Sequence, residues 1–189
     1  MTDIRADVWF ANIIWQTSLA IDNSKLKQKA DELRLYTEGV KITNQQGWQS
    51  KSVGTEDIVL TEFKTVLDQV VSKCASSVEL PSLKFMNLWF NINPPGAYNT
   101  LHNHQDSILS GVYYIDVPES NMGNIEFLRE DDIQYYMPTL KKYNQFTSQK
   151  AVYKPEAGML LLFPSWLKHQ VLSNQSNSDR YSLSFNYGV

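Results

Sequence analysis

The spacing of apolar residues changes character partway along the chain. In the first eighty residues, apolar side chains recur every three to four positions in two stretches, 24–36 and 57–76. This spacing is typical of amphipathic helices. In the first stretch the apolar stripe is Leu26, Ala30 and Leu33, with Ser24 in the position of an N-cap and Gly39 beyond the end. The pattern predicts two helices.

Beyond residue 80 the pattern becomes that of short strands. Runs rich in β-branched and aromatic residues are separated by Pro, Gly, Asn and Ser, which are typical of turns. The predicted strands are 7–16, ahead of the helices, and then 85–93, 108–117, 124–128, 151–154, 158–163, 169–172 and 181–187. Helices followed by many short strands indicate an α+β protein whose body is a double-stranded β-helix, the jelly-roll or cupin-like barrel.

The length of 189 residues fits a single domain, 1–189. We expect residues 1–80 to form the opening strand and the helices packed on the barrel, and residues 81–189 to form the jelly-roll core. The stretch 129–150 shows no clean period, and we expect an insertion that serves as a lid or lies on the surface. A polar loop is predicted at 41–55.

Composition narrows the classes of partner. The net charge is -3 and the sequence contains no basic run, which disfavours a nucleic-acid substrate. No apolar stretch approaches membrane-spanning length, and the first residues lack the pattern of a signal peptide. The single cysteine, Cys74, lies on the apolar stripe of the second helix and fits a reducing compartment. We therefore expect a cytoplasmic protein; a homodimer is compatible with the sequence.

The three histidines are the strongest chemical signal in the sequence. His102 and His104 are two residues apart, and His169 follows far downstream behind a long apolar run. A close pair with one distant histidine on strand-like sequence is how a jelly-roll barrel holds one transition metal. Imidazole and carboxylate ligands together suit Fe(II) or a similar divalent ion.

The spacing permits two ligand sets. Alternate residues of a strand share a face, so His102, His104 and Asp106 can project the same way. One set is His104, Asp106 and His169, two imidazoles and a carboxylate, as in the facial triad of non-haem iron oxygenases. The other set replaces Asp106 with His102. Ordinary polar residues at a barrel mouth are the plain alternative to either.

Arg180 and Ser182 form a second signal. The turn at 173–179 returns the last strand beside the strand that starts at His169, so Arg180 can reach into one end of the metal pocket. A guanidinium grips a carboxylate through two parallel hydrogen bonds, and Ser182, which shares its face, can add a third. Such a pair suits the distal carboxylate of a small diacid that chelates the metal at its other end.

At these residues the chain resembles the 2-oxoglutarate- and Fe(II)-dependent dioxygenases, and within them a group of bacterial and phage proteins. The segments that carry the resemblance are Trp89–Asn91, His102–His104, Ser110–Tyr114, Gly158–His169 and Arg180–Asn186. The group often has Pro after its second histidine, whereas this chain has Gln105 and Asp106. We favour His104, Asp106 and His169 as ligands, with His102 as the alternative to Asp106.

The resemblance implies Fe(II) as the metal and 2-oxoglutarate as a co-substrate, held by Arg180 and Ser182 with Tyr113 or Tyr114 and Asn99 nearby. It implies hydroxylation of an unidentified prime substrate, a small molecule or a protein side chain, with release of succinate and CO2. Trp48, Gln49 and Tyr135 are the candidates for contacts with that substrate.

Cupins are a rival resemblance, because Gly96 and Gly158 stand at cupin-like distances before the histidines. The glutamate that cupins place after the histidine pair is missing. A cupin enzyme with three histidines, indifferent to 2-oxoglutarate, and a non-catalytic jelly-roll binding module remain the alternatives.

Overall fold

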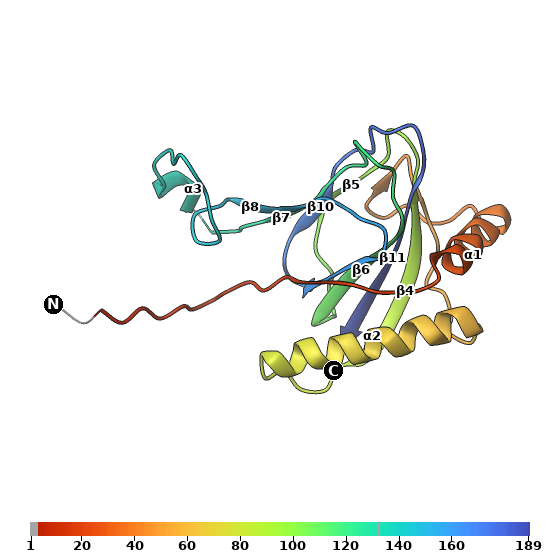
Figure 1. The fold of residues 1–189 in the computed structure, drawn as a ribbon, viewed down its shortest axis with the longest axis horizontal. Helices are drawn as coiled ribbons and strands as arrows, with labels where there is room; N and C mark the ends of the chain where they lie inside the picture. The colour runs from red at the N-terminus through yellow and green to blue at the C-terminus, as the bar shows by residue number, and fades with distance from the viewer. Residues whose placement is uncertain (1–3, 132) are drawn as a thin grey trace.

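The computed structural model describes residues 4–131 and 133–189. Two antiparallel sheets face each other and enclose the interior of the barrel (Figure 1). The larger sheet contains, in spatial order, β1 (Trp15–Ser18), β9 (Met159–Pro164), β6 (Leu109–Asp116), β11 (Arg180–Gly188), β4 (Lys84–Asn93) and β3 (Trp48–Gln49). The smaller contains β2 (Asn44–Gln45), β5 (Tyr98–His102), β10 (His169–Val171), β7 (Ile125–Leu128) and β8 (Lys150–Tyr153). This is the predicted jelly-roll body.

Two helices cover the outer face of the larger sheet, α1 (Asn23–Tyr36) and α2 (Ile58–Ser77) (Figure 1). The buried stripe of α2 is Leu60, Phe63, Leu67, Val71 and Ala75. It packs into one hydrophobic core with the outward-facing residues of the sheet. Asp57 caps α2, and Asp22 caps α1 by accepting from the backbone N–H of Ser24. The predicted N-cap, Ser24, was thus wrong by two residues.

The long strand β11 separates two environments. Its odd-numbered residues Tyr181, Leu183, Phe185 and Tyr187 belong to the core beneath the helices. Its even-numbered residues Arg180, Ser182, Ser184 and Asn186 line the interior of the barrel. Because the side chains of a strand alternate between its faces, one strand serves both the core and the cavity.

The predicted opening strand, 7–16, was largely wrong. Strand β1 begins only at Trp15, where it pairs with Leu162 of β9. Since β9 ends at Pro164, the residues before Trp15 have little partner strand to pair with, despite their apolar and β-branched composition. Three strands were missed: β5, which carries His102, and the two-residue strands β2 and β3 inside the predicted loop.

The insertion at 129–150 projects away from the barrel beyond the β7–β8 hairpin (Figure 1). Its described part includes a single helical turn, α3 (Ile133–Tyr136). It therefore does not cover the cavity as a lid. No helix among the described residues is both long enough and apolar enough to cross a membrane.

Candidate metal centre and its cavity

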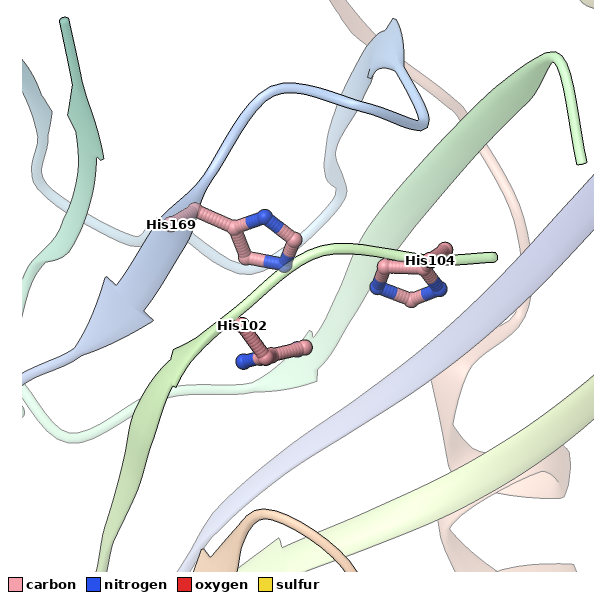
Figure 2. A group of neighbouring side chains, drawn as sticks. All are labelled: His102, His104 and His169. Carbon is pink, nitrogen blue, oxygen red and sulfur yellow. The ribbon is translucent and has the colours of Figure 1, made fainter. Parts of the chain in front are cut away.

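The fold brings the three histidines together. His102 at the end of β5 and His169 at the start of β10 are direct partners across the antiparallel pair, and His104 lies in the turn that follows β5. Their rings converge from these two segments (Figure 2). One ligand atom from each histidine lies within 4.8 Å of the others, a grouping that could hold a metal ion. Small side-chain rotations would bring three nitrogens to the distance of about 2.1 Å typical of metal–imidazole bonds.

Asp106 does not join this group. Strand β5 ends at His102, and Asp106 is exposed with a left-handed backbone, φ 62°. The alternation that would have aimed His104 and Asp106 to one side no longer applies in that turn. The favoured set of His104, Asp106 and His169 is therefore not the one that the structure assembles. The structure instead brings together the alternative set, His102, His104 and His169.

Two of the histidines are oriented by backbone carbonyls. The Nδ1 of His102 lies 2.7 Å from the carbonyl oxygen of Thr100, and the Nδ1 of His169 lies 3.0 Å from that of Leu167. A carbonyl can only accept, so Nδ1 carries the proton and Nε2 keeps its lone pair for a metal. Burial lowers the pKa of His102 below its usual range and that of His169 to about 3. Both rings are thus neutral near pH 7, as ligands must be.

His104 is held by different contacts. Its ring stacks against Trp89 with centroids 5.7 Å apart, and the nearby side chain of Asn186 favours its protonated form. Asn186 is itself fixed by Ser110, whose hydroxyl donates to the Asn186 Oδ1 at 2.7 Å. Burial, with a contribution from His102, lowers the pKa of His104 to about 4. The backbone N–H of His104 donates to Ser165, which fixes the turn.

The histidines lie in the wall of a cavity of about 510 Å³. The other end of this cavity contains Arg180, which is 2 % exposed and lies opposite Asn93 of β4. Its Nη1 donates to the carbonyls of Met122 and Gly123, at 2.5 and 2.8 Å. Ser182, two residues on, lines the same cavity. The predicted hairpin between the last strand and the strand at His169 was wrong, because β10 belongs to the smaller sheet and β11 to the larger.

One buried polar atom lacks a partner among the described residues, and it is the Nε of Arg180. A buried cation without an acidic partner is costly, and the described residues that line the cavity include no acidic side chain, so the guanidinium of Arg180 suits an anionic ligand. Three neutral imidazoles and a buried guanidinium in one cavity fit a divalent metal with an anion that reaches from it. The residues present therefore suit iron together with 2-oxoglutarate.

Of the other predicted co-substrate contacts, Asn99 lines the cavity and Tyr113 does not. Tyr113 is on the helix-facing side of β6, where its hydroxyl donates to Asn23 at 2.6 Å. Its neighbour Tyr114 faces the cavity, and burial raises its pKa to about 12 despite the charge of Arg180 nearby. Sequence reasoning placed both tyrosines near the pocket but could not choose the face.

The predicted substrate contacts also divide into residues that line the cavity and residues that do not. Gln49 lines the cavity. Trp48 instead belongs to the core under the helices and donates through Nε1 to the carbonyl of Thr37. Tyr135 is 76 % exposed on the projecting insertion, away from the cavity. The neighbouring residues of β4, Asn87 and Asn91, line the cavity and were missed; the alternation of apolar and amide residues along that strand was the available signal.

Comparison with protein families matches residues 87–186 to the family described as "Putative 2OG-Fe(II) oxygenase". The match covers more than half of the chain, from β4 to the end of the cavity-lining part of β11, and the chain belongs to this family. It is accordingly an enzyme of the group that uses Fe(II) and 2-oxoglutarate. A search of curated proteins found no match.

Solved structures share the fold at low sequence identity. A prolyl-4-hydroxylase from Pseudomonas putida aligns over 93% of this chain and 91% of its own, with 16% identity and a TM-score of 0.68. A prolyl hydroxylase from Trichoplax adhaerens, in complex with a hypoxia inducible factor peptide fragment, aligns over 93% and 83%, with 11% identity and a TM-score of 0.70. HygX from Streptomyces hygroscopicus, with nickel and 2-oxoglutarate bound, aligns over 93% and 82%, with 13% identity and a TM-score of 0.64.

Proposed function

We propose that the protein hydroxylates a prime substrate in an Fe(II)- and 2-oxoglutarate-dependent reaction, with His102, His104 and His169 as the metal ligands. The observation that carries this proposal is the shared cavity of the histidine cluster and the buried, partly unpaired Arg180. A metal site alone would suit many enzymes. A buried guanidinium at the far end of the same cavity suits a co-substrate with a second carboxylate.

Arg180 and Ser182 have separate roles in binding 2-oxoglutarate. Arg180 receives the distal carboxylate of 2-oxoglutarate, and its contacts with Met122 and Gly123 keep the guanidinium fixed before the ligand arrives. Ser182, on the same face of β11, adds a hydroxyl donor. Because the guanidinium is already in place, binding costs little further ordering of the side chain.

When bound, iron and 2-oxoglutarate supply the oxidising chemistry: dioxygen is reduced, 2-oxoglutarate becomes succinate and CO2, and one oxygen atom enters the prime substrate. The protein supplies position and a sheltered cavity. Trp89 and Phe163 pack beside the ring of His104, and Phe163 and Phe127 pack beside that of His169. This apolar wall holds the ligand rings and limits water behind them.

Thermal stabilisation tests the proposal directly. We expect Fe(II), under argon, to raise the melting temperature, and 2-oxoglutarate to raise it further only when the metal is present. Arg180→Lys keeps the charge but loses the planar fork, so it should weaken 2-oxoglutarate binding by about tenfold or more while metal binding persists.

Arg129→Lys, on the projecting insertion, is the matched control and should behave as the wild type. Stabilisation by metal with no additional effect of 2-oxoglutarate would contradict the proposal, and so would an Arg180→Lys variant that binds 2-oxoglutarate normally. Formation of succinate that requires both iron and 2-oxoglutarate would support the proposal independently.

The prime substrate belongs to the classes on which proteins of this fold act. The structural neighbours include a prolyl hydroxylase bound to a peptide fragment and HygX, solved with hygromycin B bound. For this chain we accordingly propose a substrate that is a peptide or a small molecule.

A further inference from the structure

Acidic side chains are absent from the described residues that line the cavity. Its polar surface consists of amides, hydroxyls and the three histidines, and its formal charges are those of Arg180 and Lys51. The chain as a whole carries more acidic than basic residues, 20 against 17. The absence of acids is therefore a property of the cavity and does not follow from the composition.

The two cations lie at different levels of the cavity. In the strand register, Arg180 of β11 lies opposite Asn93 of β4. Beyond β3 the chain stays alongside β4, because the N–H of Ser50 donates to the carbonyl of Phe90 and the N–H of Val53 to that of Leu88. Lys51 therefore lies near the level of residue 89, four positions before Asn93. Four residues of a strand span about 13 Å.

The level of Lys51 is the level of the histidines, because the ring of Trp89 stacks on His104. Arg180 is buried, whereas Lys51 is exposed and makes no side-chain hydrogen bond or ion pair with the described residues. Arg180 thus occupies the closed end of the cavity, and Lys51 stands at its open side near the metal centre. The position of Lys51 suits a molecule that enters after 2-oxoglutarate.

The net charge of the loaded cavity also bears on the substrate. This step rests on the function proposed above. Three neutral histidines leave both charges of a divalent ion uncompensated. The two carboxylates of 2-oxoglutarate cancel them, so the loaded cavity retains the charges of Arg180 and Lys51. In a partly desolvated cavity, such an excess attracts anions and repels cations.

We propose that the prime substrate is an organic acid whose anionic group is bound by Lys51. The uncharged remainder of the substrate meets amide side chains: Gln49 makes no side-chain hydrogen bond to the described residues, and the Nδ2 of Asn91 donates to Ser184, which leaves its Oδ1 available. Val40 and Ile42 give the same region an apolar side. A cationic substrate finds no counter-charge among the described residues of this cavity.

Matched triplets of small molecules test the proposal: a carboxylic acid, its primary amide and the amine of the same carbon skeleton. Binding is measured by saturation-transfer NMR on Zn(II)-loaded protein with saturating 2-oxoglutarate, because zinc occupies histidine sites without redox turnover. Acids should bind in preference to their amides, and amines should not bind. Lys51→Gln should weaken acid binding by about fivefold, and Lys51→Glu by more than about tenfold.

Lys73→Glu, on the exposed side of α2, is the control and should leave acid binding unchanged. The proposal is overturned if no acid binds, if amides or amines bind as well as the acids, or if Lys51→Glu binds acids like the wild type. Affinity for 2-oxoglutarate is measured in the same samples. If the wild type did not bind 2-oxoglutarate, the proposed function would be overturned. Normal 2-oxoglutarate binding without selectivity for acids would overturn the proposed substrate class alone.

Discussion

The two faces of β11 differ in what their polar groups do. On the helix side, hydroxyls are paired with residues of α1 and α2: Tyr181 donates to Asp31 at 2.8 Å and Tyr187 to Asp68 at 2.6 Å. On the cavity side, the Nε of Arg180 has no partner among the described residues. The paired hydroxyls of the helix side contribute to folding, whereas Arg180 on the cavity side carries a charge without an acidic partner among the described lining residues and suits a ligand.

This contrast extends to β6, where Tyr113 and Tyr114 are adjacent in sequence. Tyr113 anchors α1 through Asn23, while Tyr114 lies in the cavity beside Arg180. Substitutions on one face should therefore change stability, and substitutions on the other should change ligand binding. Five variants probe the site and this separation.

The largest effect is expected on the cavity side from His169→Ala. Removing a metal ligand should reduce metal affinity by more than the roughly 10–100-fold that is lost when a residue hydrogen-bonded to a ligand is replaced. Isothermal titration with Fe(II) or Zn(II) measures it, and activity should disappear. The metal-free variant should still unfold cooperatively. A variant that binds metal normally would exclude the three-histidine site.

On the helix side, Phe185→Ala should lower the free energy of unfolding by about 3–5 kcal/mol, because it empties a fully buried position in the core. Chemical denaturation gives this value. Metal and 2-oxoglutarate affinities of the folded fraction should match the wild type. If both affinities fell in proportion to stability, the two faces would not be independent.

Tyr187→Phe should have a smaller effect on the same face, about 1 kcal/mol, since it removes one hydrogen bond to a partly exposed carboxylate. Burial, together with the bond to Asp68, raises the pKa of Tyr187 above its usual value of 10.0. In alkaline solution the unfolded chain loses this proton first, so stability should fall as pH rises above about 10. Denaturation from pH 8 to 11 should show a shallower decline in the variant than in the wild type.

The smallest effect is expected from Asp106→Asn. The side chain is exposed and outside the histidine cluster, so metal affinity should change by less than about twofold. His102→Ala is the matched comparison and should lose binding as His169→Ala does. The opposite result would restore the carboxylate ligand favoured by the sequence.

Much of the barrel could be predicted from the sequence because its long strands carry a strong period. Strands such as 85–93 and 108–117 appear within one residue of their expected limits, as β4 and β6. The strands that were missed or misplaced, β1, β2, β3 and β5, depend on their partner strands rather than on their own composition. Long-range pairing is not visible in a local pattern.

The candidate site was predictable where a residue lies inside a regular strand. Arg180 and Ser182 share a face of β11, as alternation requires. The same rule does not extend to Asp106, because β5 ends at His102 and Asp106 has a left-handed backbone. For Tyr113 the face itself was undetermined, since both sides of β6 are buried and its sequence shows no polar alternation.

The pairing of His102 with His169 across β5 and β10 has a mechanical consequence. Strand β10 has only three residues, and the chain between His104 and His169 includes the whole projecting hairpin. An ion bound by all three histidines would therefore act as a crosslink that closes this long loop and ties two strands of the smaller sheet. Without the ion, that end of the barrel would open more readily.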